Sequence, residues 1–149
     1  MAAGCRLPAD WLPVFEERML AYAQKTMTEE SRTAPLAIDL LLQPHEVSFE
    51  LLQWFDRMRP FGKENPRPRV LLSDLVVLEA RFVGRGEKKL SLRLSPREGG
   101  RVIAAVGENA DRYGRIRGGD HVDCVGELRQ DTWRGRRDVI VRIRDLKVR

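Results

Sequence analysis

The sequence has 149 residues, only two cysteines and no long apolar run. A membrane-spanning helix needs about 20 consecutive apolar residues, which no part of this sequence provides. Cys5 and Cys124 lie too far apart to form a spaced metal-binding pair, and two cysteines are too few for a disulfide scaffold. The first residues also lack the basic start and apolar core of a signal peptide. We therefore expect reduced thiols and a cytoplasmic location.

The common sequence patterns of catalysis are missing as well. His45 follows a proline and His121 begins a predicted strand, and neither belongs to a His-Glu-x-x-His motif. The sequence contains neither a Gly-x-Ser-x-Gly elbow nor a Gly-x-x-x-x-Gly-Lys-Ser/Thr phosphate loop. Its acidic residues are not clustered in a way that would hold two metal ions. We predict no catalytic residue, no metal site and no cofactor in this chain.

Positive charge is abundant, and it is unevenly distributed. The chain has 27 Lys and Arg residues against 22 Asp and Glu residues, a net charge of +5. Residues 1–66 contain seven basic and ten acidic residues (net −3), whereas residues 67–149 contain twenty and twelve (net +8). An excess of positive charge in one half favours a polyanionic partner, although a merely solvated basic surface has the same composition.

The two halves meet at a segment rich in proline. Residues 58–70 contain three prolines and one glycine, which neither a helix nor a central strand accepts. Helical periodicity precedes this segment, and strand periodicity follows it. We predict a stiff junction at residues 58–68 between residues 1–57 and residues 69–149. A surface loop within a single domain is the alternative.

Residues 1–57 predict two helices and a short strand. Trp11, Phe15, Met19 and Tyr22 recur at helical spacing up to about Lys25, and we interpret this stripe as a packing face. Residues 36–42 alternate as a strand does. Ser48 is a suitable N-cap for a helix over residues 49–58, with Leu51, Leu52, Phe55 and Met58 on one face. These elements would bury little area by themselves, so we expect them to pack against another structure.

Residues 69–149 predict five strands, at 70–83, 88–94, 102–106, 121–129 and 139–144. A helical turn is expected at 109–113, between the third and fourth strands. Leu90, Leu92 and Leu94 fall on one face of the second strand, and Val139, Val141 and Ile143 on one face of the fifth. The fold class is therefore α+β: a small N-terminal α/β segment followed by a five-stranded OB-fold barrel. A six-stranded sandwich and an SH3-like barrel remain alternatives.

Basic residues gather where OB folds hold a single nucleic-acid strand, on the face of strands two and three and in the loop between strands four and five. Cations there contact phosphates, and an aromatic plane adds about 1–3 kcal/mol per stacked base. The Trp133 side chain would either stack on a base or cap the end of the barrel. The face of strands two and three has no outward aromatic residue. The predicted binding residues are Lys88, Lys89, Arg93, Trp133, Arg134, Arg136, Arg137, Arg142 and Arg144.

Two stretches resemble a known family. The junction reads Met58-Arg-Pro-Phe-Gly-Lys-Glu-Asn-Pro-Arg-Pro68, and residues 131–137 read Asp-Thr-Trp-Arg-Gly-Arg-Arg before a last strand that ends in Asp145. Both are similar to segments of RecJ, the single-stranded-DNA-specific exonuclease family. The junction match rests on Pro60, Phe61, Gly62, Asn65 and Pro66. Residues 76–94 resemble the first OB hairpin of that family, and Ala2-Ala-Gly4 resembles a segment of its DHHA1 domain.

The resemblance implies a C-terminal piece of such an enzyme. Residues 1–57 would correspond to a partial DHHA1 domain, 58–68 to the junction and 69–149 to an OB domain that binds single-stranded DNA. In the family, a DHH domain with Mg²⁺ or Mn²⁺ degrades DNA from 5′ to 3′ in repair and recombination. Neither an Asp-His-His triplet nor a Gly-Gly-His triplet occurs in this sequence, so we expect the chain alone to be inactive.

Expected partners are single-stranded DNA, a catalytic DHH polypeptide or a single-strand-binding protein. Two other interpretations stay open. In the first, the barrel is a module that docks a repair protein. In the second, the chain is a gene remnant without a function of its own.

Overall fold

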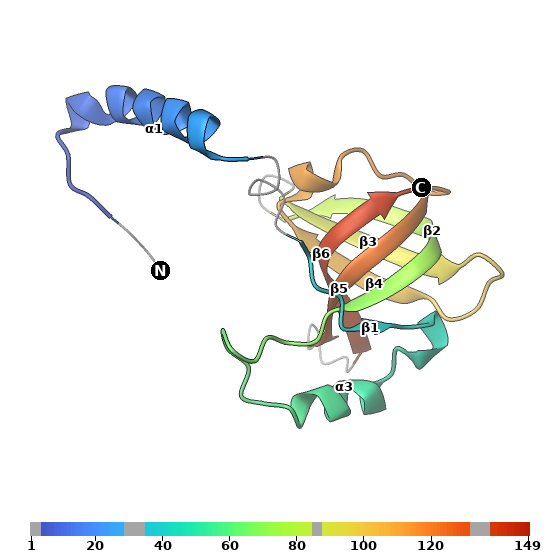
Figure 1. The fold of residues 1–149 in the computed structure, drawn as a ribbon. Helices are drawn as coiled ribbons and strands as arrows, with labels where there is room; N and C mark the ends of the chain where they lie inside the picture. Colours follow the sequence, from blue (N-terminus) through green and yellow to red (C-terminus); the bar gives the residue numbers. More distant parts are fainter. Residues whose placement is uncertain (1–3, 29–34, 85–87, 132–137) are drawn as a thin grey trace. The chain divides into compact units, whose positions relative to one another are not determined.

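The computed structural model describes residues 4–28, 35–84, 88–131 and 138–149, which belong to two compact units (Figure 1). The first unit is Met1–Leu36, and the second is Ala37–Arg149. In the first unit, the short 3-10 helix η1 (Ala9–Trp11) leads into α1 (Leu12–Thr26), which confirms the first predicted helix. No residue of α1 is buried, so what its aromatic stripe packs against stays a prediction. No helix in the described ranges is long and apolar enough to cross a bilayer.

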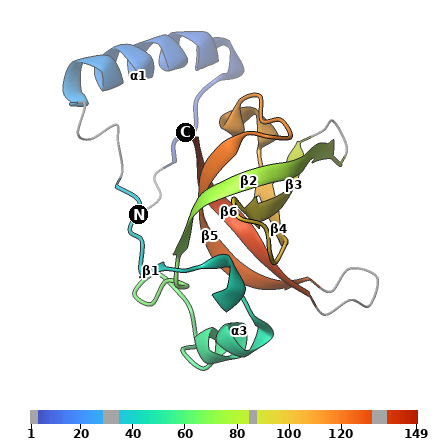
Figure 2. The same ribbon diagram turned by 90° about the vertical axis from the view of Figure 1, so that its right-hand side faces the viewer.

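The second unit is built around a closed sheet. Its strands in the described residues are β1 (Leu40–Leu41), β2 (Val70–Val83), β3 (Lys89–Pro96), β4 (Ile103–Glu108), β5 (His121–Asp131) and β6 (Asp138–Val148). The order is β1-β2-β3-β4-β6-β5, and a further pairing of β5 with β2 closes the ring. Only β4 and β6 run parallel within this ring of five strands. The predicted OB-fold barrel is confirmed, and Figure 2 shows it from a second side.

Strand β2 takes part in both sides of the barrel because it bends. Residues 70–76 pair with β5, and residues 75–83 pair with β3. The register shifts between Leu72 and Leu75, where Asp74 adopts a φ of 54°. The backbone N–H of Asp74 donates to Asp123 Oδ1 at 2.9 Å, which anchors the bend to β5. A β-bulge of this kind is the usual means of turning a strand through a barrel corner.

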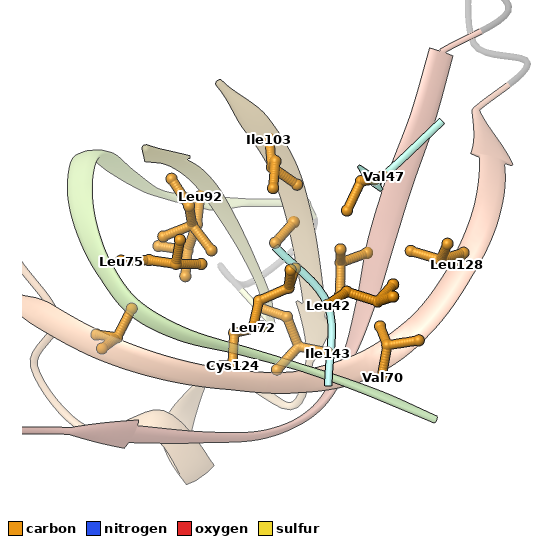
Figure 3. Close-up of a cluster of buried hydrophobic side chains, with 14 of the residues drawn as sticks. Leu42, Val47, Val70, Leu72, Leu75, Leu92, Ile103, Cys124, Leu128 and Ile143 are labelled. Carbon is orange, nitrogen blue, oxygen red and sulfur yellow. The ribbon is translucent and has the colours of Figure 1, made fainter. Parts of the chain in front are cut away.

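Alternating apolar residues fill the inside of the barrel (Figure 3). Leu90, Leu92 and Leu94 of β3 are buried, as are Val139, Val141 and Ile143 of β6, so both predicted inward faces are confirmed. Cys124 of β5 is completely buried among them. Burial raises the pKa of its thiol to about 12, with the nearby Asp145 carboxylate adding to the effect. Cys124 is therefore a core residue rather than a reactive thiol.

The segment before β2 closes one end of the barrel. The 3-10 helix η2 (Pro44–Glu46) and the helix α3 (Phe49–Asp56) lie below the strands in both ribbon views. Leu42, Val47, Leu52 and Phe55 are buried and belong to the same apolar cluster as the strand residues. Ser48 caps α3, because its Oγ accepts the Leu51 N–H at 3.1 Å. The short 3-10 helix η4 (Ala110–Tyr113), which was predicted as a helical turn, lies at the opposite end.

The division between the two units lies earlier than the predicted junction. Residues 37–57 were assigned to the N-terminal segment, but they belong to the compact unit that contains the barrel. The physical reason is long-range packing, since four of their side chains complete the barrel core. The strand expected at 36–42 is reduced to Leu40–Leu41, which pairs in parallel with Val70 and Leu71. The backbone contact continues to Leu42, whose N–H donates to the Leu71 carbonyl at 2.9 Å.

Because α3 completes the core, shortening Phe55 should destabilise the whole barrel. We expect Phe55→Ala to lower the free energy of unfolding by about 3–5 kcal/mol. Leu41→Ala is the control, since Leu41 is 64% exposed and its truncation should change that free energy by less than about 0.5 kcal/mol. Urea unfolding of the full chain, followed through the β-sheet signal, measures both. A barrel transition that Phe55→Ala leaves unchanged would show that α3 is dispensable.

Candidate nucleic-acid interface

The outer surface of β3, β4, β6 and β5 is continuous, because these strands are paired in register. One row across the four strands consists of Arg93, Ala104, Ile140 and Arg129. The neighbouring row consists of Ser91, Val106, Arg142 and Glu127. Every second residue along each strand points outward, so these side chains lie opposite the apolar core positions. The face is therefore a mixed surface of cations, carboxylates and small apolar residues.

Three residues of the first row, Arg93, Ala104 and Ile140, line a cavity of about 520 Å³. Arg93 and Arg101 supply positive charge there, and Val102, Ala104 and Ile140 supply apolar surface. Asp131 and Asp138 line the same cavity, and they are the described residues on either side of 132–137. The predicted residues Trp133, Arg134, Arg136 and Arg137 lie outside the described residues.

The predicted cations of β3 lie along one outer edge of the face. Lys88 is exposed directly before β3, and its carbonyl accepts the Ala110 N–H at 3.0 Å. Lys89 is exposed at the start of β3, opposite Glu108 of β4. Arg93 lines the cavity, and its guanidinium lies 4.0 Å from Glu79 of β2. Of these three residues, the structure brings only Arg93 to the cavity.

The predicted cations of β6 are both held by carboxylates. Arg142 donates to Glu108 at 3.0 Å, in a pair that is largely exposed. Arg144 contacts Glu127 of β5 at 2.6 Å. A register shift between Val125 and Gly126 leaves Arg144 as an extra residue, which brings it to the side of Glu127. The sequence analysis did not identify these acidic partners, because strand pairing rather than sequence distance brings them close.

Glu127 is the buried centre of an ionic cluster. Its side chain is 5% exposed, and it also accepts from Arg129 at 2.8 Å. Burial by itself would raise the pKa of Glu127, but hydrogen bonds and charges from Arg144 and Arg129 outweigh it and hold the pKa below the usual range. Glu127 is therefore a stable anion that neutralises part of the basic face.

Sequence reasoning also missed two arginines. Arg101 lies in the turn before β4 and lines the cavity. Arg129 occupies an outward position of the predicted fourth strand and continues the row that starts at Arg93. Its alternation with the buried Leu128 was the available signal for an outward residue. Its place in the same row as Arg93 depends on the barrel topology.

The junction motif forms a compact turn between α3 and β2. The Asn65 side-chain amide donates to the carbonyls of Met58 and Pro60 at 2.8 and 2.9 Å, and the Gly62 N–H donates to the Asn65 carbonyl at 2.9 Å. The guanidinium of Arg67 lies 4.3 Å from the centre of the Phe61 ring. These contacts explain the spacing of Pro60, Phe61, Gly62, Asn65 and Pro66, since the amide of Asn65 closes the turn that the prolines begin.

The described residues do not bring together three His, Cys, Asp or Glu side chains in a way that could hold a metal ion. Three carboxylates at the candidate face, Glu79, Glu108 and Glu127, are instead paired with arginines. This arrangement suits the binding of an anion, because guanidinium groups can exchange one oxyanion partner for another.

Comparison with known proteins gives consistent matches. Residues 38–145 match the family model of the RecJ OB domain. The chain is 28% identical to the single-stranded-DNA-specific exonuclease RecJ of Bacillus subtilis, over 99% of this chain and 19% of that protein. Crystal structures of RecJ from Thermus thermophilus in complex with Mg²⁺ and with Mn²⁺ are 25% and 26% identical, each with a TM-score of 0.61. Each of these two matches covers 95% of this chain. The same matches cover 21% and 20%, respectively, of the two Thermus thermophilus chains. The chain thus spans about a fifth of the length of these relatives.

The lowered pKa of Glu127 predicts a decrease of stability in acid. A carboxylate whose pKa is lower in the folded state stabilises the fold above its ordinary value of 4.5, and this contribution disappears as the pH falls through the folded value. The stability difference between the natural chain and Glu127→Gln should therefore shrink below about pH 4.5. Urea unfolding at a series of pH values measures it.

The matched control for this experiment is Glu98→Gln, which removes an exposed carboxylate from the turn after β3. Its stability difference from the natural chain should not follow the same trend. A Glu127→Gln difference that stays constant down to about pH 3 would contradict the ionic role of Glu127.

Proposed function

Because the chain belongs to the RecJ OB domain family, we propose that its barrel binds single-stranded DNA across the outer face of β3, β4, β6 and β5. The observation that carries the proposal is the cavity of about 520 Å³ on this face, which combines the cations Arg93 and Arg101 with an apolar surface. The name of the Bacillus subtilis relative, a single-stranded-DNA-specific exonuclease, supports the choice of ligand.

The face suits a strand with charged phosphates and apolar bases. Arg93 and Arg101 would contact phosphates, and Val102, Ala104 and Ile140 would contact bases or sugars. Lys88 and Lys89 would extend the phosphate path along β3. Trp133 and the arginines at 134, 136 and 137 would reach the strand from the segment that joins Asp131 to Asp138. Trp133 would then supply a stacking plane.

Arg142 would take part through partner exchange, whereas Arg144 would contact a phosphate while it stays paired with Glu127. The Arg142–Glu108 pair is exposed, and such pairs contribute only about 0–1 kcal/mol to stability. A phosphate can therefore take the place of Glu108 at little cost. Arg144 is held more firmly, because its partner Glu127 is buried.

We further propose that the chain provides the binding part of a 5′ to 3′ exonuclease that acts in DNA repair and recombination. The match to about a fifth of each relative supports this, as does the absence of clustered metal ligands in the described ranges. The hydrolytic step would belong to a DHH domain with Mg²⁺ or Mn²⁺, and residues 1–36 would correspond to the end of a DHHA1 domain. The aromatic stripe of α1 would pack against that domain. A DHH polypeptide and a single-strand-binding protein are the proposed protein partners.

The first test removes two cations of β3. Lys89→Ala combined with Arg93→Ala should weaken binding of a single-stranded oligonucleotide, and the slope of log affinity against log salt should fall by about 0.7 for each phosphate that is no longer bound. Fluorescence anisotropy over a salt series measures both quantities. The fold should tolerate the change, because both side chains are exposed.

The control for this test is Arg97→Ala combined with Arg115→Ala, which removes the same charge from positions that do not line this cavity. It should keep most of the affinity. Equal decreases in the two double variants would indicate a diffuse charge effect instead of a site. Failure of the natural chain to bind single strands would favour a module that docks a protein partner.

The second test alters a carboxylate, whereas the first test altered cations. Glu108→Gln should strengthen oligonucleotide binding, because it frees Arg142 and removes a like charge from the phosphate path. The thermal midpoint should change little, since the pair is exposed. A decrease in affinity at every salt concentration would contradict this role for the face around Arg142.

A further inference from the structure

A second basic cavity lies between the junction turn and the barrel. Its volume is about 290 Å³. Phe61, Gly62 and Pro66 line it from the junction side, and Arg67 and Arg69 from the chain leading into β2. Glu127 and Arg129 of β5 and Arg144 of β6 complete the lining. The cavity thus collects four guanidinium groups around one carboxylate.

The four arginines are unequally compensated. Arg129 and Arg144 share Glu127, and Arg67 pairs with Asp56 at 3.2 Å. Arg69 has no ion pair among the described residues, since its neighbour Asp39 accepts the Arg69 backbone N–H and not the guanidinium. Arg59 also pairs with Asp56, so five cations face the three carboxylates Glu127, Asp56 and Asp39, a local excess of two positive charges.

Two of these guanidinium groups also have unused donors. The Nε atoms of Arg69 and Arg129 are buried, and neither has a hydrogen-bond partner in the described part of the chain. A buried donor without a partner costs free energy, so native proteins rarely retain one without a reason. The excess positive charge at this cavity is accounted for by an oxyanion ligand.

We propose that this cavity is a phosphate-binding site and that it holds one phosphate of the nucleic-acid strand that crosses the barrel. The assignment of the phosphate to a DNA strand rests on the proposed function. Planar guanidinium groups bind phosphate through paired N–H donors, and Arg69 is the arginine of this cavity without an ion pair among the described residues. The site lies outside the cavity at Arg93, and it gives the junction turn a role in binding.

Continuity with the first cavity favours a nucleic-acid phosphate over the carboxylates of an acidic peptide. Arg129 lines the second cavity and also ends the row that begins at Arg93. Three strand spacings, about 14 Å, separate the two residues across the face. One strand passing from β3 toward β5 would therefore place phosphates near both cavities.

The test uses Arg69→Gln in the full chain. Oligonucleotide affinity should fall about tenfold, as expected when a charge-assisted hydrogen bond is removed, and the salt slope should fall by about 0.7. Inorganic phosphate at constant ionic strength should raise the thermal midpoint of the natural chain and not that of Arg69→Gln. Without phosphate, the midpoint of Arg69→Gln should be equal to or above that of the natural chain, because the substitution removes an unpartnered buried donor and an uncompensated charge.

Arg129→Gln is the second variant, in case Arg69→Gln does not fold, and it should also lack the response to phosphate. Arg115→Gln is the matched control, because Arg115 is exposed and lines neither basic cavity. An undiminished phosphate response in folded Arg69→Gln or Arg129→Gln would overturn the site. So would a lower midpoint of Arg69→Gln without phosphate together with unchanged binding, since that result identifies a structural cluster.

The outcomes also separate this inference from the proposed function. If the natural chain binds no oligonucleotide but its phosphate response depends on Arg69, the phosphate site stands and the assignment to a DNA strand fails. If the chain binds oligonucleotide and Arg69→Gln changes neither affinity nor slope, the proposed function stands and this site does not contribute. A glutamate-rich peptide that displaces phosphate more strongly than an oligonucleotide does would overturn the assignment to nucleic acid.

Discussion

The double pairing of β2 is the constraint on which the rest of the structure depends. One strand of fourteen residues serves two neighbours, β5 along its first half and β3 along its second. The bulge at Asp74 allows the strand to turn between them, and it closes the ring. Closure leaves one inner surface for apolar side chains and one outer surface for polar ones. It also brings β3 and β5 onto the same outer face, although the 24 residues 97–120 lie between them in the chain.

A second irregularity shapes the basic face. Between β5 and β6 the register shifts at Gly126, and Arg144 is the residue left over. A Cβ at position 126 would lie 2.6 Å from the carbonyl oxygen of Arg142, so only glycine fits at this point. The close approach of the two strands lets Arg144 reach Glu127. A backbone feature thus decides which cations share the buried carboxylate.

In the proposed binding role, the carboxylates would make the face more selective than its net charge implies. Glu79, Glu108 and Glu127 each pair with arginines that a phosphate would contact. The exposed pairs are weak and can exchange partners, whereas the buried Glu127 holds Arg129 and Arg144 in place. On such a surface, a phosphate would bind by replacing a carboxylate as the partner of an arginine, and not by contacting arginines that have no partner. The contribution of an arginine to binding would therefore depend more on its position on the face than on the total number of basic residues.

Local patterns in the sequence determined the secondary structure. Alternation with a period of two placed the five barrel strands, and Ser48 marked the start of α3. The junction residues and the outward arginines of β3 and β6 were also identifiable, because side-chain direction in a strand follows from the sequence alone. Tertiary structure decided the rest. Residues 37–57 joined the barrel because their apolar side chains complete its core, and packing of this kind has no local signal. The meeting of Arg69, Arg129 and Arg144 around Glu127 depends on strand order and on one bulge, both of which arise from hydrogen bonding between residues far apart in the chain.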